Sequence, residues 1–232
     1  MTSPWFPDTE KWPVEHPDRL QLYTMATPNG QKVSIALEET GLPYEWHLVN
    51  IREGDQHRPD YLQLSPNGKI PTILDPDGPG GQPLVMMESG AILLYLAEKT
   101  GQLIPRDARG RLAVQQWLFF QMAHVGPMFG QFGHFFKFAR EQTQDDYAVT
   151  RYTNEAKRLL GVLDARLETS EWLAGDDYSV ADIATGPWVN GLTFYGGEEV
   201  LELASFNHVL RWQAAFNARP AVQRGRVIGQ VA

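Results

Sequence analysis

A change of pattern near residue 107 limits what this chain can fold into. Before it, short apolar strands alternate with helical runs, whereas after it apolar residues recur only at helical spacing. A chain of 232 residues can bury one large core or two smaller ones, so length alone does not decide. The pattern favours two units, one that mixes strands and helices and one that is all helical.

The first part of the chain predicts a sheet of four short strands. These strands are expected at residues 20–24, 45–50, 70–74 and 84–87. The last two are joined by a loop rich in glycine and proline, as an antiparallel pair would be. Helical stretches lie between and after the strands, at residues 33–39, around 61–64 and at 89–99. This order predicts a mixed four-stranded sheet with helices packed on it.

The second part predicts only helices. Residues 111–138, 147–167, 180–195 and 206–218 show helical spacing, and Ser179 with Asp182 fits a capping box. We therefore expect three segments, which are an N-terminal extension at 1–18, an α/β domain at 19–101 and an all-helical domain at 107–232.

The N-terminal extension is rich in proline and carries acidic residues. This composition is the opposite of a basic and then apolar signal peptide, so we expect a cytoplasmic protein. Such an extension is usually a poorly ordered tail. Three aromatic residues would also suit a segment that lies on the folded body or on a partner subunit, namely Trp5, Phe6 and Trp12.

The composition argues against several classes of protein. A formal charge of -8 disfavours a nucleic-acid-binding surface, and no apolar stretch approaches the ~20 residues that cross a membrane. The six histidines include no pair at helical ligand spacing, and no P-loop or dinucleotide fingerprint occurs, so we expect no metal and no nucleotide. Because the chain has no cysteine, any thiol chemistry must use a thiol that a ligand supplies.

Three runs, in order along the chain, carry a specific resemblance. They are Thr-Pro-Asn-Gly-Gln-Lys-Val at 27–33, Ser-Pro-Asn-Gly-Lys-Ile-Pro at 65–71, and Glu-Ser-Gly-Ala-Ile-Leu-Leu-Tyr-Leu-Ala-Glu-Lys at 88–99. With the two-unit pattern they resemble the glutathione transferase superfamily, most closely its bacterial Nu-class and Ure2-like branch. The resemblance implies a thioredoxin-like N-terminal domain, a homodimer, and one or two glutathiones per subunit. Phe120 departs from the tryptophan of this branch and leaves the shape of the acceptor pocket open.

The turn at residues 27–30 is the expected site of thiol activation. An unperturbed thiol, with a pKa of ~8.5, is only slightly ionised near neutral pH, so the site must favour the thiolate. Thr27 and Asn29 stand just ahead of the first helix, where donors for an anion belong. An isolated Thr-Pro-Asn-Gly would more often be only a turn and a cap. Tyr23 ranks below Thr27, because strand alternation can equally place it in the sheet's packing.

The resemblance implies further contacts with glutathione. Ile70, before a cis Pro71, would pair its backbone with the cysteinyl unit. Glu88 would meet the ammonium of the γ-glutamyl end, and Ser89 with its helix N-terminus the carboxylate. Two residues would contact the glycyl side and the tripeptide backbone, Gln56 and Lys69. Glu88 and Ser89 could also be a plain helix start, and Gln56 and Lys69 solvated loop residues.

The helical domain is expected to add the second substrate's contacts. In this branch an arginine that matches Arg151 approaches a second glutathione or the disulfide form, although a surface arginine is the commoner case. Four side chains are spaced to line an acceptor pocket, or alternatively to form a buried stripe that supports the core or the dimer contact. They are Phe132, His134, Phe135 and Phe138.

These observations predict a glutathione-dependent thiol-disulfide oxidoreductase. One bound thiolate would attack a small disulfide, and a second glutathione would resolve the mixed disulfide, so the protein needs no cysteine of its own. Two alternatives stay open. The same site could conjugate glutathione to an electrophile or reduce an organic peroxide, or the protein could be a non-catalytic glutathione-binding regulator.

Overall fold

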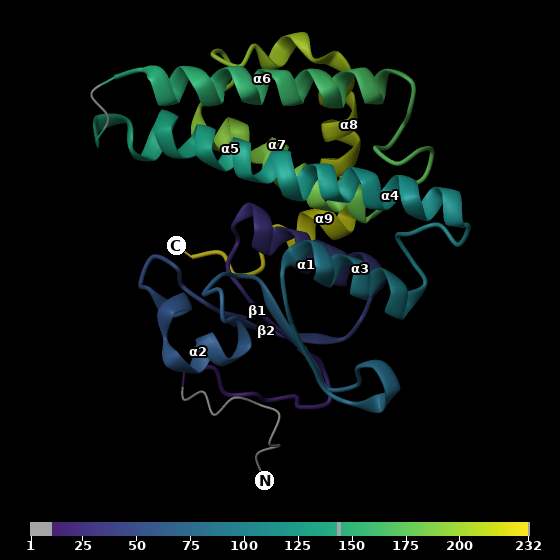
Figure 1. Ribbon diagram of the computed structural model, residues 1–232. Coiled ribbons are helices and arrows are strands. Elements are labelled where there is room, and N and C mark those ends of the chain that lie inside the picture. Colours follow the sequence, from purple (N-terminus) through teal and green to yellow (C-terminus); the bar gives the residue numbers. More distant parts are fainter. Residues whose placement is uncertain (1–10, 143–144, 232) are drawn as a thin grey trace. The chain divides into compact units, whose positions relative to one another are not determined.

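The computed structural model describes residues 11–142 and 145–231 (Figure 1). The chain divides by packing into two units. The N-terminal unit joins Met1–Thr100 with Pro220–Ala232, and the helical unit is Gly101–Arg219. The sequence pattern had assigned 107–232 to one helical domain, whereas the segment from Pro220 packs with the N-terminal unit. A local pattern predicts a helix but does not show which core the helix joins.

The N-terminal unit contains the predicted mixed sheet. Its strands run in the order β2-β1-β3-β4, with β1 parallel to β2 and antiparallel to β3, and β3 antiparallel to β4. Helices α1 and α3 pack together on one face of the sheet (Figure 1). The elements are β1 (Leu20–Thr24), α1 (Pro28–Thr40), β2 (Tyr44–Leu48), η1 (Asp55–His57), α2 (Pro59–Leu64), β3 (Thr72–Asp75), η2 (Pro79–Gly81), β4 (Leu84–Met87), α3 (Ser89–Thr100) and α9 (Pro220–Gly225).

The C-terminal segment is bound to α1. The Ser34 hydroxyl donates to the carbonyl of Gly225 at 2.8 Å, and the Ala26 N–H donates to the carbonyl of Gly229 at 3.0 Å. A Cβ on Gly225 would lie 2.6 Å from the Cα of Ile35, so only glycine allows this approach. Helix α1 is therefore covered by α3 and by α9, and residues 32–37 of α1 are all buried.

One residue of the N-terminal extension lies in the core of this unit. Trp12 is 4% exposed and packs in a cluster with Tyr23 and Tyr61. Its Nε1 donates to the carbonyl of Leu48 at 2.6 Å. The described part of the extension thus lies on the folded body, as its aromatic content allowed, while Trp5 and Phe6 fall outside the described residues.

The helical unit is built around one buried helix. Helix α7 contacts α4, α5 and α8, and it is apolar nearly all round, as a helix enclosed by others must be. The predicted run at 111–138 is helical but includes two π-helical segments. The elements are α4 (Ala108–Phe120), η3 (Gln121–Val125), α5 (Gly126–Gly133), η4 (His134–Phe138), η5 (Arg140–Gln142), α6 (Tyr147–Glu168), α7 (Val180–Tyr195), η6 (Leu203–Ser205) and α8 (Asn207–Ala218).

The predicted capping box at the start of α7 is confirmed, and its carboxylate does more than cap. Asp182 is fully buried and accepts the N–H of Ser179 at 3.0 Å. It also accepts the N–H of Leu173 at 2.9 Å and the indole N–H of Trp212 at 2.8 Å. One carboxylate therefore joins the start of α7 to the preceding loop and to α8. Among the described helices, none is both long and apolar enough to cross a membrane.

Replacing this carboxylate should destabilise the helical unit strongly. Asp182→Ala leaves several buried donors without an acceptor, and each costs ~1–3 kcal/mol, so we expect a loss on the order of 3–5 kcal/mol. Urea unfolding followed by circular dichroism measures the loss. Asp177→Ala, at an exposed position nearby, is the matched control. Equal unfolding midpoints for the two variants would contradict the assigned role.

Candidate functional site

The start of α1 is set by a close backbone approach. A Cβ on Gly30 would lie 2.0 Å from the carbonyl oxygen of Met25, so no residue with a side chain fits there. Thr27 is the N-cap, and its Oγ1 accepts the N–H of Gly30 at 3.3 Å. A threonine hydroxyl that accepts one bond retains its own proton to donate. Capping the helix and donating to a ligand anion are thus compatible roles for Thr27.

Asn29 lies in the first turn of the same helix. Its side chain and that of Thr27 are half-buried, and both residues stand at the positive end of the α1 dipole. Tyr23, in contrast, lies in the core, stacked on His47 with ring centroids 4.6 Å apart. Burial raises the pKa of the Tyr23 phenol. An anion near the end of β1 therefore finds donors at the α1 N-terminus and not at Tyr23.

The segment before β3 has the predicted cis peptide bond, between Ile70 and Pro71. The carbonyl of Lys69 accepts the hydroxyl protons of Tyr61 and Ser65, each at 2.9 Å. Tyr61 is fully buried, whereas the side chain of Lys69 is exposed. Two buried hydroxyl groups thus fix the backbone of this segment through the Lys69 carbonyl.

The turn from β4 into α3 has a strained residue. Glu88 has a φ of 70°, an uncommon backbone conformation for a residue other than glycine. Such strain costs on the order of 1–3 kcal/mol and occurs most often at functional positions. Ser89, the first residue of α3, is 4% exposed, and the side chain of Glu88 is exposed. The two residues stand at the N-terminus of a helix of 12 residues, which suits an anionic group.

Lys32 also belongs to this site, although its residue type predicts no role for it. It is 1% exposed, and its Nζ donates to the Ser89 hydroxyl at 3.4 Å. Burial lowers the pKa of Lys32 to about 7, and the negative charge of Glu88 opposes that shift. A lysine on a helix is ordinarily solvated, so the residue type alone does not indicate a buried site residue. The one sequence feature that could have pointed to Lys32 is its position within the run at 27–33. Lys32 places a buried amine behind the start of α3.

Gln56 lies in η1, at the end of the loop that follows β2. Its side chain is half-buried, and Oε1 is shielded from solvent without a hydrogen bond from any described residue. A shielded carbonyl oxygen that lacks a donor is costly, and a donor from a ligand would remove that cost. A Cβ on Gly68 would lie 3.1 Å from the Gln56 carbonyl, so this loop lies against the run at 65–71.

In the helical unit, Arg151 is exposed on α6. It borders a cavity of about 540 Å³ that also involves Met128, in the first turn of α5. The lining residues are Met128, Tyr147, Thr150, Arg151, Tyr152, Asn154, Glu155 and Arg158. This cavity is a place where the helical unit could receive a polar or anionic group.

The four residues expected to line an acceptor pocket do not share one environment. Phe132 is fully buried and stacks on Phe136 with centroids 4.9 Å apart, as the interpretation of a buried stripe describes. Phe135 is half-buried and stacks on Tyr152 at 5.5 Å. His134 is exposed beside Phe135, whereas Phe138 is 57% exposed and packs on Phe194 and Tyr195. The π-helical segment η4 changes the spacing at which side chains share one side of a helix, so these residues face different surroundings.

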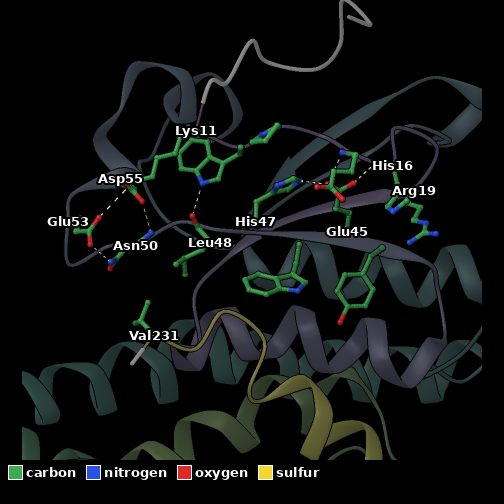
Figure 2. A pocket seen from close by; sticks show the side chains of 15 residues that line it. Lys11, His16, Arg19, Glu45, His47, Leu48, Asn50, Glu53, Asp55 and Val231 are labelled. Carbon is green, nitrogen blue, oxygen red and sulfur yellow. Dashed lines mark hydrogen bonds and ion pairs between the residues drawn. The ribbon is translucent and has the colours of Figure 1, made fainter.

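A larger cavity lies elsewhere in the N-terminal unit and was not predicted (Figure 2). Its volume is about 800 Å³, and it lies between the start of the described chain and β2. None of the residues assigned to glutathione lines it. Within the described ranges, no group of three or more histidine, aspartate or glutamate side chains could hold a metal ion.

Known proteins and protein families match most of the chain, and the matches point to the same family. The model of the glutathione S-transferase N-terminal domain matches residues 26–99, and that of the C-terminal domain matches residues 122–220. The chain is 46% identical over 213 residues to the disulfide-bond oxidoreductase YfcG of Escherichia coli strain K12, which covers 91% of this chain and 96% of that protein.

Solved structures are similar over nearly the whole length. A glutathione transferase from Burkholderia graminis, with two glutathione molecules bound per subunit, is 59% identical with a TM-score of 0.94, covering 96% of this chain and 93% of that one. A glutathione transferase from Pseudomonas putida, with one glutathione disulfide bound per subunit, is 54% identical with a TM-score of 0.93, covering 96% and 97%.

The buried amine of Lys32 predicts a dependence of stability on pH. Between about 10.5 and about 7, the unfolded chain binds a proton at Lys32 that the folded chain does not, so the free energy of unfolding falls as pH is lowered through this range. Lys32→Met removes this loss. The variant's gain over the wild type should therefore grow as pH falls, up to a few kcal/mol, because one pKa unit is worth ~1.4 kcal/mol.

Urea unfolding at several pH values measures this difference. Lys157→Met, at a half-buried surface lysine of the helical unit, controls for the loss of a lysine as such. A difference between Lys32→Met and the wild type that does not vary with pH would show that Lys32 keeps its proton in the folded protein.

Proposed function

The chain belongs to the glutathione S-transferase superfamily, and from this premise we propose that it is a glutathione-dependent thiol-disulfide oxidoreductase. The absence of cysteine from all 232 residues carries the proposal, because the thiol that attacks a disulfide must then come from a ligand. A relative of nearly equal length is a disulfide-bond oxidoreductase, and similar structures hold glutathione or its disulfide.

The γ-glutamyl end of glutathione is assigned to the turn between β4 and α3. Its carboxylate would accept from Ser89 and from the N-terminus of α3, with the Lys32 amine behind them at 3.4 Å from the Ser89 hydroxyl. Its ammonium would meet the exposed carboxylate of Glu88. The strained backbone of Glu88 fits this role, since a ligand contact can repay local strain.

The rest of the tripeptide is assigned to two segments of the same unit, which are the turn that carries Gln56 and the segment before β3 that carries Lys69 and Ile70. The backbone of Ile70 would pair with the cysteinyl unit, and its neighbour Lys69 is already held through its carbonyl. Gln56 would contact the glycyl side, where a donor from the ligand would satisfy its shielded Oε1. Lys69, whose side chain is exposed, would meet the terminal carboxylate.

The thiol would be activated at the start of α1. Lowering its pKa by ~2 units requires about 2.7 kcal/mol of preferential stabilisation of the thiolate, within reach of two or three directed donors at a helix N-terminus. The hydroxyl proton of Thr27, the side chain of Asn29 and the first N–H groups of α1 are such donors. The positive end of the helix dipole adds to the same effect.

The reaction then proceeds by two thiol-disulfide exchanges. The bound thiolate attacks one sulfur of a small disulfide, which forms a mixed disulfide and releases the other half as a thiolate. A second glutathione thiolate attacks the glutathione sulfur of the mixed disulfide and releases the remaining half. Two glutathiones lose two electrons in total and become glutathione disulfide, and the substrate gains them as two thiols.

We assign Arg151 and the half-buried and exposed aromatic residues of the helical unit to the second glutathione and the acceptor. An arginine binds a carboxylate through two parallel N–H donors, and glutathione has two carboxylates. We further propose that the protein is a homodimer and acts in the cytoplasm, where the glutathione pool is kept reduced. Sedimentation of the purified protein as a monomer would contradict the dimer.

Loss of the Thr27 hydroxyl should slow the reduction of 2-hydroxyethyl disulfide by glutathione. Thr27→Ala removes one donor to the thiolate, so the pKa of the bound thiol should rise by ~1 unit, from ~6.5 to ~7.5, and the rate at pH 7 should fall about threefold with the thiolate fraction. Asn29→Ala should have a similar effect. Coupling to glutathione reductase and NADPH measures the rate, and the ultraviolet absorbance of the thiolate measures the pKa.

Thr27→Ser, which keeps the hydroxyl, is the matched control and should retain most of the activity. Full activity in both alanine variants would contradict the assignment of the thiolate site. A wild-type protein that binds glutathione but does not reduce the disulfide would contradict the proposed reaction, and it would favour conjugation or a regulatory role.

A further inference from the structure

The N-terminal segment at residues 11–16, here called the N-terminal strap, is bound along the edge of the sheet. The indole N–H of Trp12 donates to the carbonyl of Leu48 at 2.6 Å. At the other end, the backbone N–H groups of residues 15 and 16 donate to the two carboxylate oxygens of Glu45, at 2.9 and 2.7 Å. Figure 2 shows Lys11 at one end of the cavity beneath the strap and His16 at the other.

An ion pair joins the strap to the loop that carries Gln56. The Nζ of Lys11 lies 2.5 Å from Oδ1 of Asp55, while Oδ2 of Asp55 accepts the backbone N–H of Asn50 at 2.8 Å. Asp55 is only 3% exposed, so its charge needs a partner, and Lys11 supplies the cation (Figure 2). Gln56 is the next residue in the chain, and its position therefore depends on how Asp55 is held.

A second contact joins the strap to the segment before the cis proline. The Trp12 ring packs edge-on against Tyr61 with centroids 5.8 Å apart. The Tyr61 hydroxyl donates to the carbonyl of Lys69 at 2.9 Å and bonds with the Thr72 hydroxyl at 3.0 Å. Trp12 thus supports the residue that holds the Lys69 backbone.

We propose that Lys11 and Trp12 are positioning residues for glutathione, which act through the Asp55–Gln56 turn and through Tyr61. This inference rests on the proposed function, because it assumes that Gln56, Lys69 and Ile70 contact the tripeptide. The strap holds both glutathione-binding loops in their binding geometry before the ligand arrives. Its contacts with Glu45, Leu48, Asp55 and Tyr61 lie on elements other than the helix start assigned to thiolate formation, so we expect it to govern affinity for glutathione and not the chemical step.

Lys11→Ala in the full-length protein tests the proposal. Without the ammonium, the buried Asp55 carboxylate loses its counter-ion and the turn that carries Gln56 relaxes. We expect the Kd for glutathione, from isothermal titration, and its KM to rise about three- to tenfold, with kcat nearly unchanged. Lys11→Arg, which retains a cation, should restore most of the affinity. Lys157→Ala, which breaks the 2.8 Å pair with Glu202 in the helical unit, should leave both constants unchanged.

A double-mutant cycle shows whether Lys11 acts through Gln56. Gln56→Ala alone should weaken binding, and Lys11→Ala should add little to it, because the contact that Lys11 positions is already gone. Fully additive effects, or wild-type affinity in Lys11→Ala, would overturn the inference. A wild-type protein that binds no glutathione would instead contradict the proposed function, and the inference with it.

Discussion

The site in the N-terminal unit depends on how closely α1 begins against the end of β1. The missing side chain at Gly30 lets the first turn lie against the carbonyl of Met25, where a Cβ would be 2.0 Å away. This close approach fixes where α1 begins, so Thr27 becomes its N-cap and the first N–H groups of α1 point out of the start of the helix. Further along the same helix, Lys32 reaches Ser89 at the start of α3. Two helix N-termini, which we propose hold a thiolate and a carboxylate, are thus fixed relative to each other within one unit.

Buried charged groups hold each unit together where elements meet. Asp182 joins α7 to α8 in the helical unit, and Asp55 joins the strap to the loop after β2 in the N-terminal unit. Each has its cost of burial offset by directed donors or by a cation. Lys32 differs, because burial lowers its pKa to about 7. A buried amine whose pKa is lowered by burial, beside a strained residue, is typical of a binding site.

Much of the fold could be predicted, because it follows from local patterns. Short apolar runs bounded by turn residues predicted the four strands, helical spacing predicted the helices, and Ser179 with Asp182 predicted a helix start. The cis bond before Pro71 followed from a resemblance and is present. The role of Lys32 could not be predicted, since nothing local shows that both α3 and α9 cover α1. The separation of Phe132 from Phe138 was missed because a π-helical turn changes the direction of side chains that an α-helical spacing would align.

The sequence by itself determined the class of fold, the superfamily and the need for an external thiol, because these depend on residue types and on their order. Only the tertiary structure decided which surfaces meet. It assigned the segment from Pro220 to the N-terminal unit and buried Lys32 behind Ser89. It also paired Lys11 of the extension with Asp55 and packed Trp12 on Tyr61. The physical reason is that burial and pairing arise from contacts between residues distant in the chain. Lys11 and Asp55 are 44 positions apart, and Lys32 and Ser89 are 57 apart.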